Sequence, residues 1–141
     1  LFLPKMVRIQ QMMDVFADLM LKHLPQISAH FTKHGVLSAM FVTPWFMTFY
    51  CRDFSFDLVS RVWDSFLNGD SKIIYRVGLA LLRVNQAQIR QSNFEEIMAL
   101  MNGLPRTVDA EKVWASVWTV KIRTEEIEDL ERKHALDAAA R

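Results

Sequence analysis

The sequence has few residues that reshape a backbone: four glycines and four prolines among 141 residues. A single cysteine, Cys51, excludes an intramolecular disulfide. Its aromatic neighbours predict a small buried thiol, and the lack of other cysteines suggests an intracellular protein. The 17 basic and 16 acidic residues nearly cancel, so there is no concentrated positive charge to attract nucleic acid. No glycine-rich phosphate-binding loop is present either.

Long hydrophobic runs are also missing. The longest uncharged run, Val36 to Cys51, contains Pro44 and is shorter than the roughly 20 residues that span a bilayer. It predicts buried helices joined by a turn, with no transmembrane segment. The sequence begins with Leu1 and shows no signal peptide, so we expect a segment of a longer polypeptide.

What is abundant is apolar sequence, at 51% of all residues. Apolar residues recur every three to four positions, as in helices with one buried face, and no stretch alternates like a half-buried strand. We therefore predict one all-α domain, a helical bundle of about seven helices. The expected helices cover residues 6–24, 26–34, 45–51, 55–67, 72–85, a segment after 92, one after 109, and 124 onward.

Several residues predict where these helices begin and end. Pro25 ends the first helix, and Gly35 closes the second in a left-handed conformation. Pro44 suits the first turn of a helix from Trp45 to Cys51. Ser55 is the expected cap of the helix that carries Trp63, a predicted core residue.

Later helix ends depend on similar signals. Asp70 or Ser71 can cap the helix of residues 72–85, which is apolar nearly all round and is therefore expected at the centre of the bundle. Ser92 and Glu95 form a predicted capping box. The sequence Asn-Gly-Leu-Pro at 102–105 is expected to end that helix, and Asp109 to cap the next. From Thr124 the chain is charged, which predicts an exposed, fraying helix with Ile127 and Leu130 as its main apolar contacts.

Few residues suggest chemistry. His30 and His34 are four apart, the spacing of two metal ligands on one helix face, but no third ligand lies nearby, so ordinary surface histidines are favoured. The acidic pairs at 95–96 and 125–126 fall in first turns of helices, where the helix dipole favours them. Asp64 and Arg76 are charges on otherwise apolar helices. We hypothesise that they pair; the alternative is two separate charges at the rim of the core.

Four sequence stretches occur in an order that resembles a known family. They are HLPQISAHF (23–31), FVTPWFMTFY (41–50), RVWDSFL (61–67) and KIIYRVGLALL (72–82). Together they resemble the C-terminal half of the TBC domain, found in activators of Rab-type small GTPases. The resemblance implies a C-terminal half-domain over residues 1–105 and a helical extension of the same lobe over 106–141, with a frayed end.

The resemblance also implies a mechanism in which the activator supplies an arginine and a glutamine to a bound GTPase. The arginine pattern is Ile-x-x-Asp-x-x-Arg, and its nearest match here, starting at Val15, ends in Leu21. The glutamine pattern is Tyr-x-Gln, but Tyr50 is followed by Arg52 and Tyr75 by Val77. The resemblance places both motifs in the other half of the domain, so no catalytic residue is expected in this chain. The matching family residues are assigned to packing and support: Trp45, Phe46, Phe49, Arg52, Trp63, Asp64 and Arg76.

The implied partners are a Rab-type small GTPase and the N-terminal half of the same TBC domain. No cofactor is expected, because GTP and Mg²⁺ would be bound by the GTPase. A lone half-domain would expose an apolar face, which predicts a homo-oligomer, a separate partner half or rearranged helices. The expected location is the cytoplasm, peripheral to endomembranes. Two alternatives remain: a catalytically inactive TBC-like interaction module or scaffold, and an unrelated helical bundle that matches by chance.

Overall fold

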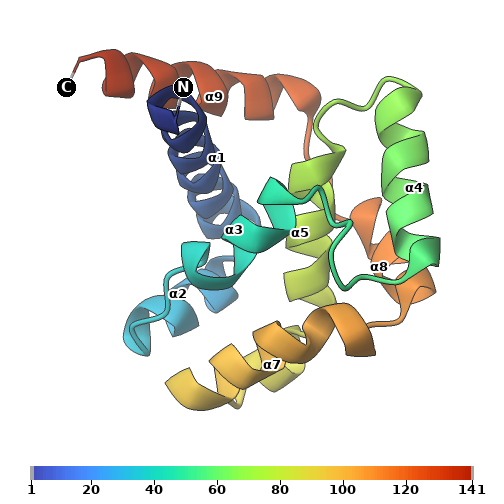
Figure 1. Cartoon of the computed structure of the whole chain (residues 1–141). Coiled ribbons are helices and arrows are strands. Elements are labelled where there is room, and N and C mark those ends of the chain that lie inside the picture. Colours follow the sequence, from blue (N-terminus) through green and yellow to red (C-terminus); the bar gives the residue numbers. More distant parts are fainter. Residues whose placement is uncertain (1, 141) are drawn as a thin grey trace.

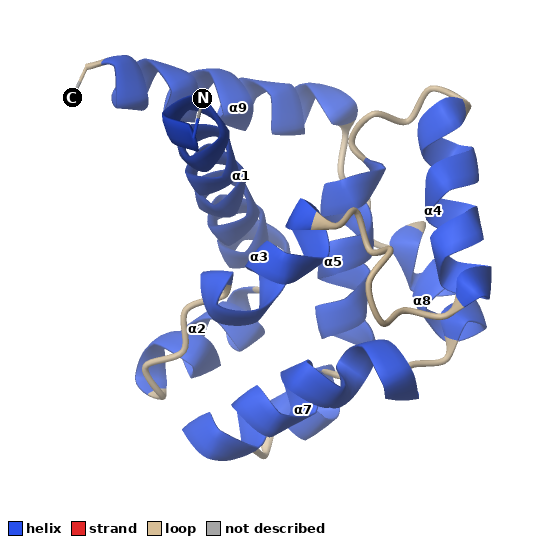
Figure 2. Cartoon of the chain, in the orientation of Figure 1, coloured by secondary structure: helices blue, strands red, loops and turns tan. Residues whose placement is uncertain are grey.

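The computed structural model describes residues 2–140, with the side chains of residues 6–140. Within this range the chain forms nine helices and no strand, which confirms the all-α prediction (Figure 2). The helices are α1 (Phe2–His23), α2 (Pro25–Lys33), α3 (Ala39–Met47), α4 (Phe56–Leu67), α5 (Ile73–Val84), α6 (Gln86–Arg90), α7 (Phe94–Thr107), α8 (Ala110–Val117) and α9 (Thr124–Ala139).

Helix α5 lies at the centre of the bundle, as its sequence predicts (Figure 1). Every residue from Ile73 to Leu82 is buried, because α1, α3, α4, α6 and α8 all pack against this helix. Gly78 permits the closest approach: a Cβ at this position would lie 2.7 Å from the ring of Phe16 on α1. The packing of α1 on α5 therefore requires a residue without a side chain.

Helix α9 crosses α1 on one side of the molecule (Figure 1). Ile127 is fully buried and Leu130 is packed against the core, so the predicted apolar contacts of this helix are confirmed. Polar pairs fix the crossing: Glu126 accepts from His23 at 2.7 Å, and Asp18 lies 2.6 Å from His134. Ile127 is the only buried residue of α9, and most of its other residues are exposed, as predicted for this terminal helix.

Several predicted helix ends are confirmed. Pro25 begins α2 directly after α1, and Gly35 follows α2 with φ of 71°, the left-handed conformation that glycine adopts without strain. The Ser55 side chain accepts from the Leu58 amide, and Asp109 accepts from two amides of α8. These ends were predictable because each is set by one local side chain or backbone conformation.

Other predicted ends are wrong. Pro44 lies inside α3, which begins at Ala39, and Pro105 lies inside α7. In both helices threonine hydroxyls bond to carbonyls near the proline: Thr43 bonds to Ala39 at 2.7 Å and Thr107 bonds to Gly103 at 3.2 Å. Tertiary burial of Phe41 and Leu104 keeps these short helices intact despite the missing amide.

Two further cap assignments shift by one or two residues. The capping box of α7 is formed by Asn93 and Glu96, with bonds of 2.9 and 3.0 Å, and not by Ser92 and Glu95. Ser92 instead donates to the carbonyl of Gln88. Before α5, Asp70 accepts from the Lys72 amide at 3.1 Å, but Lys72 itself occupies the cap position.

Candidate functional site

The family-motif residues of α3 form part of the aromatic core. Trp45 and Phe46 are 5% and 4% exposed. The Phe46 ring packs edge-on against Phe16, at 5.5 Å between ring centres, and against Tyr75, at 5.4 Å. Trp45 packs edge-on against Phe54 at 5.8 Å. Since such pairs add to the stabilisation from burial alone, the packing role predicted for Trp45 and Phe46 is consistent with their positions.

The turn after α3 has an unusual backbone. Phe49, Tyr50 and Asp53 have positive φ angles of 51°, 64° and 69°, a conformation that costs non-glycine residues about 1 kcal/mol or more each. Tyr50 holds this turn, because its ring is fully buried and its hydroxyl donates to the Ile74 carbonyl at 2.6 Å. Burial raises the pKa of Tyr50 well above its ordinary value, so this hydroxyl stays neutral and remains a donor.

The same turn places polar side chains on the surface. The Arg52 side chain is 74% exposed and lies 3.7 Å from the Asp53 carboxylate. An ion pair this exposed contributes little to stability, so Arg52 is available to other molecules. Cys51 is also exposed, which makes the prediction of a buried thiol wrong. Left-handed residues precede it at Phe49 and Tyr50 and follow it at Asp53, so Cys51 lies in a turn and not in the helix that was expected from Trp45 to Cys51.

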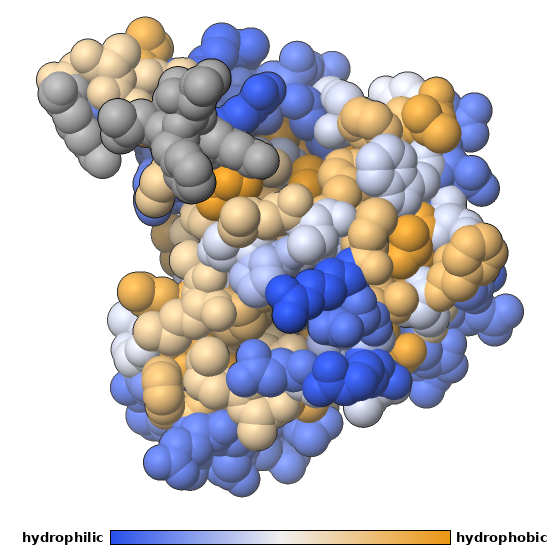
Figure 3. All heavy atoms as spheres, viewed as in Figure 1, coloured by the Kyte–Doolittle hydropathy of each residue, from blue (hydrophilic) through white to orange (hydrophobic). Residues whose placement is uncertain are grey.

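Trp63 does not lie in the core as predicted. It is 36% exposed and packs with Phe49 and Phe66 at the surface, with ring-centre distances of 4.6 and 5.9 Å. Its indole nitrogen donates to the Cys51 sulfur at 3.3 Å. Only Leu58 and Val62 of α4 are buried. On the face shown in Figure 3, apolar side chains gather over α4. The helical spacing predicted for α4 is correct, but the apolar face of this helix is wider than the part that neighbouring elements bury.

Arg76 and Asp64 do not pair, which contradicts the hypothesis. Arg76 is 9% exposed, and its Nε lies 3.3 Å from the Asp70 carboxylate. Its guanidinium also donates to the Ile122 carbonyl and, at 3.2 Å, to the Thr124 hydroxyl. Asp64 is exposed on α4 and takes part in no ion pair among residues 6–140. The actual partners come from the loop before α5 and from a segment nearly 50 residues later, which sequence spacing did not indicate.

His30 lies on α2 and bonds to a distant segment, and His34 caps the C-terminal end of α2. His30 lies 2.8 Å from the Ser92 carbonyl, and its ring centre is 4.4 Å from that of His34. In the part of the chain that the structure describes, no group of three histidine, cysteine or acidic side chains could hold a metal ion. The helices in that part are also too short or too polar for any of them to cross a membrane.

The nearest match to the arginine pattern lies on α1. Its first position, Val15, is 1% exposed, whereas Leu21 is 62% exposed. The intermediate Asp18 pairs with His134 of α9. The last position of this partial match is therefore at the surface and carries a leucine.

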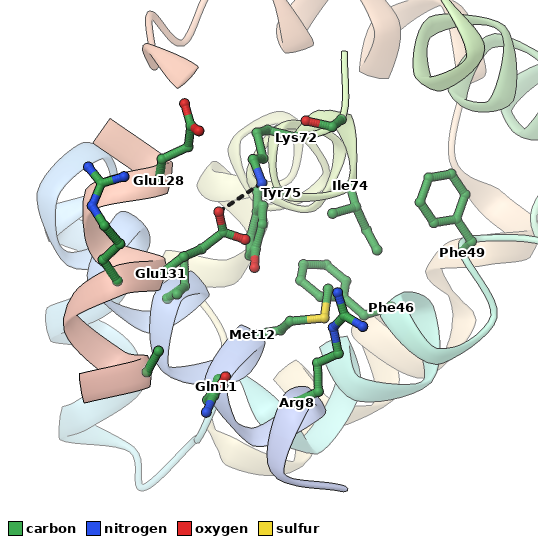
Figure 4. Close-up of a pocket in the computed structure, with 14 residues that line it drawn as sticks. Arg8, Gln11, Met12, Phe46, Phe49, Lys72, Ile74, Tyr75, Glu128 and Glu131 are labelled. Atoms are coloured by element: carbon green, nitrogen blue, oxygen red, sulfur yellow. Dashed lines mark ion pairs between the residues drawn. The ribbon is translucent and has the colours of Figure 1, made fainter. Parts of the chain in front are cut away.

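A groove that the sequence did not predict lies between α1, the end of α3, the start of α5 and α9. Its volume is about 710 Å³, and its walls include Met12, Phe46 and Tyr75 (Figure 4). An ion pair between Lys72 and Glu131, at 2.8 Å, crosses one side of it. No sequence signal indicated the groove, because its walls come from four separate segments.

The described residues form a helical bundle with an aromatic core, and the motif residues Trp45 and Phe46 lie in that core. The Rab-GTPase-TBC domain model matches residues 1–90, and the chain belongs to this family. The resemblance stated from the four motifs is thereby confirmed.

Individual proteins of the family show how far the similarity extends. The mouse Ecotropic viral integration site 5 protein is 29% identical over 137 residues, or 95% of this chain. The mouse TBC domain-containing protein kinase-like protein is 30% identical over 121 residues, and bovine TBC1 domain family member 14 is 28% identical over 103. The chain spans only 17%, 13% and 15% of these relatives' lengths, respectively.

Proposed function

We propose that the chain is part of a GTPase-activating protein for Rab-family small GTPases. In this proposal it is the structural lobe that supports catalysis by an arginine and a glutamine located in the N-terminal half of the TBC domain. The observation that carries the proposal is the family match over residues 1–90, which includes all four motif stretches.

The motif residues have positions suited to support. Trp45 and Phe46 are buried around α5, and Arg76 joins the start of α5 to the segment before α9. These contacts fix the relative positions of helices on which a partner half would rest.

The partners in this proposal are a Rab-type GTPase, which would itself hold GTP and Mg²⁺, and the N-terminal half of the same domain. The division into a half-domain over 1–105 and an extension over 106–141 remains a prediction. A cytoplasmic location, peripheral to endomembranes, is also a prediction, and so is a homo-oligomer formed through exposed apolar surface.

A GTP-hydrolysis assay tests the proposal. A panel of Rab proteins is mixed with this chain alone, and with this chain plus the N-terminal half of a TBC domain. We expect no acceleration by the chain alone, and an acceleration of about 10³ to 10⁵ with both halves, the range that an arginine finger supplies. Acceleration by the chain alone would refute the absence of catalytic residues.

The second candidate is a catalytically inactive TBC-like module or scaffold. It is kept as a candidate because neither the arginine pattern nor the glutamine pattern is complete in these 141 residues. This candidate predicts that a Rab protein binds the chain with unchanged hydrolysis, even when both halves are present. Rab binding measured by calorimetry, beside the hydrolysis rate, separates the two functions.

A further inference from the structure

The packing of α9 against α1 contains few apolar contacts. Ile127 is the only buried residue of α9, and Leu130 adds a second apolar contact with the core. None of residues 131–139 is buried, and Leu136 is 71% exposed. In α5, by contrast, every residue from Ile73 to Leu82 is buried. Because apolar burial supplies most of the free energy of helix packing, α9 should be held less firmly than α5.

Ion pairs and hydrogen bonds supply the other contacts between the two helices. Lys22 lies 3.0 Å from the Glu126 carboxylate, and Lys133 lies 3.6 Å from that of Asp18, with a histidine beside each of these pairs. The lysine side chains are 62% and 60% exposed, so water and dissolved ions reach both pairs. Exposed pairs of this kind contribute little individually and weaken as the salt concentration rises. The position of α9 on α1 should therefore depend on salt.

The start of α9 is anchored more firmly than the rest of the helix. Arg76 of α5 donates to the Ile122 carbonyl and to the Thr124 hydroxyl, and Ile122 is 5% exposed. These bonds attach the segment before α9 to the core. A rotation about the backbone near Arg123 would therefore move α9 away from α1 while the preceding segment stays in place.

Opening of α9 would remove one wall of the groove. Glu128 and Glu131 of α9 line this groove together with Met12 of α1 (Figure 4). Tyr75 also lines it, is 2% exposed, and has a hydroxyl without a hydrogen-bond partner among residues 6–140. Burial and the nearby charge of Glu131 raise the pKa of Tyr75, in agreement with the adjacent positions of the two side chains in Figure 4. A buried hydroxyl without a partner disfavours the closed state, and access to water after opening would relieve this.

We propose that α9 opens and closes as a unit about the backbone near Arg123, while α1 to α8 stay folded. The closed state is held mainly by charged side chains and is favoured at low salt. Opening exposes the α1 wall of the groove and the carboxylates of Asp14 and Asp18, which lie 4.0 and 2.6 Å from His134 in the closed state. Local opening of this kind is typical of elements with few buried apolar contacts. The inference concerns the chain's own conformations and does not depend on the proposed function.

Hydrogen–deuterium exchange of the whole chain, read by mass spectrometry, tests the proposal. At low salt we expect the amides of α9 to exchange about tenfold or more faster than those of α5. At about 1 M sodium chloride charges are screened beyond about 3 Å, so α9 exchange should rise by a further factor of about two to five. The exchange of α5 should not change with salt.

Charge variants test which contacts close α9. Asp18→Lys places a like charge beside Lys133 and should raise α9 exchange about three- to tenfold without changing α5 exchange. Asp64→Lys is the matched control, since it makes the same charge change on α4 at a residue without an ion pair among residues 6–140, and it should change neither. Combining Asp18→Lys with Lys133→Asp restores opposite charges and should recover part of the protection of α9.

Three results would overturn the proposal. Equal exchange of α9 and α5 at both salt concentrations would show that α9 opens only when the whole protein unfolds. Equal exchange by Asp18→Lys and Asp64→Lys would show that charges on α1 do not hold α9. A matching rise of α5 exchange in Asp18→Lys would show that opening is not confined to α9.

Discussion

Removal of the Arg76 guanidinium should destabilise the protein strongly, and this prediction can be tested in detail. Arg76→Met keeps most of the side-chain volume but removes the ion-pair partner of Asp70 and the donor to the Ile122 carbonyl. Breaking a buried ion pair by removing one partner costs about 3–5 kcal/mol. Asp70 is 20% exposed, so we expect the lower end, about 3 kcal/mol.

The free energy of unfolding is measured by urea titration, followed by tryptophan fluorescence and circular dichroism. For a chain of this size a loss of about 3 kcal/mol lowers the Tm by roughly 10 °C. Asp64→Asn is the control, because Asp64 is exposed on α4, and it should change stability by about 0.5 kcal/mol or less.

Double-mutant cycles then identify the partner of Arg76. The Arg76–Asp70 pair should show a coupling energy of about 0.5–3 kcal/mol, whereas Arg76 and Asp64 should be additive. A coupling between Arg76 and Asp64 as large as that between Arg76 and Asp70 would refute the described geometry. So would a fully stable Arg76→Met.

Three further predictions concern packing, capping and pH. Gly78→Ala should cost about 1–3 kcal/mol, since its Cβ would collide with the α1 core, while Gly103→Ala on α7 has free space and should stabilise by about 0.5–1 kcal/mol; equal effects in urea unfolding would contradict the close approach. Asn93→Ala should lower the midpoint of thermal unfolding through a loss of about 1 kcal/mol, and Ser92→Ala should have a smaller effect; the reverse order would restore the capping box expected from the sequence. Burial tends to raise the pKa of Glu126, but hydrogen bonds and charges from two basic side chains outweigh it and hold that pKa below its ordinary value. The stabilisation by ionised Glu126 is present above its unfolded pKa of about 4.3 and is lost as the pH falls through its lower folded pKa. Glu126→Gln should therefore make the free energy of unfolding fall less steeply below about pH 4.3. An unchanged pH dependence would contradict the pairing.

Local signals in the sequence predicted much of the fold. Ser55, Asp109 and Gly35 each determine a helix end within a few residues of themselves, so no tertiary information was needed. The apolar circumference of α5 likewise predicted its central position, since only a surrounded helix can bury every side.

The errors came from contacts between distant segments. Pro44 lies inside a helix because the packing of α3 outweighs the loss of one amide. Trp63 fits the apolar stripe of α4, but the turn that carries Phe49 covers this edge only in part and leaves Trp63 36% exposed. Arg76 pairs with the loop before its own helix and with residues far along the chain. Helical periodicity identifies which face of a helix is apolar, but it does not identify the element that will pack there.

The crossing of α9 over α1 has a consequence for synthesis. His23 meets Glu126, and Asp18 meets His134, across separations of 103 and 116 residues. A ribosome adding about 5–20 residues per second needs roughly 5–20 s to deliver α9 after α1 has emerged. During that interval the carboxylates and apolar side chains that α9 will cover stay open to solvent, so a nascent chain stalled before Thr124 should bind chaperones through α1.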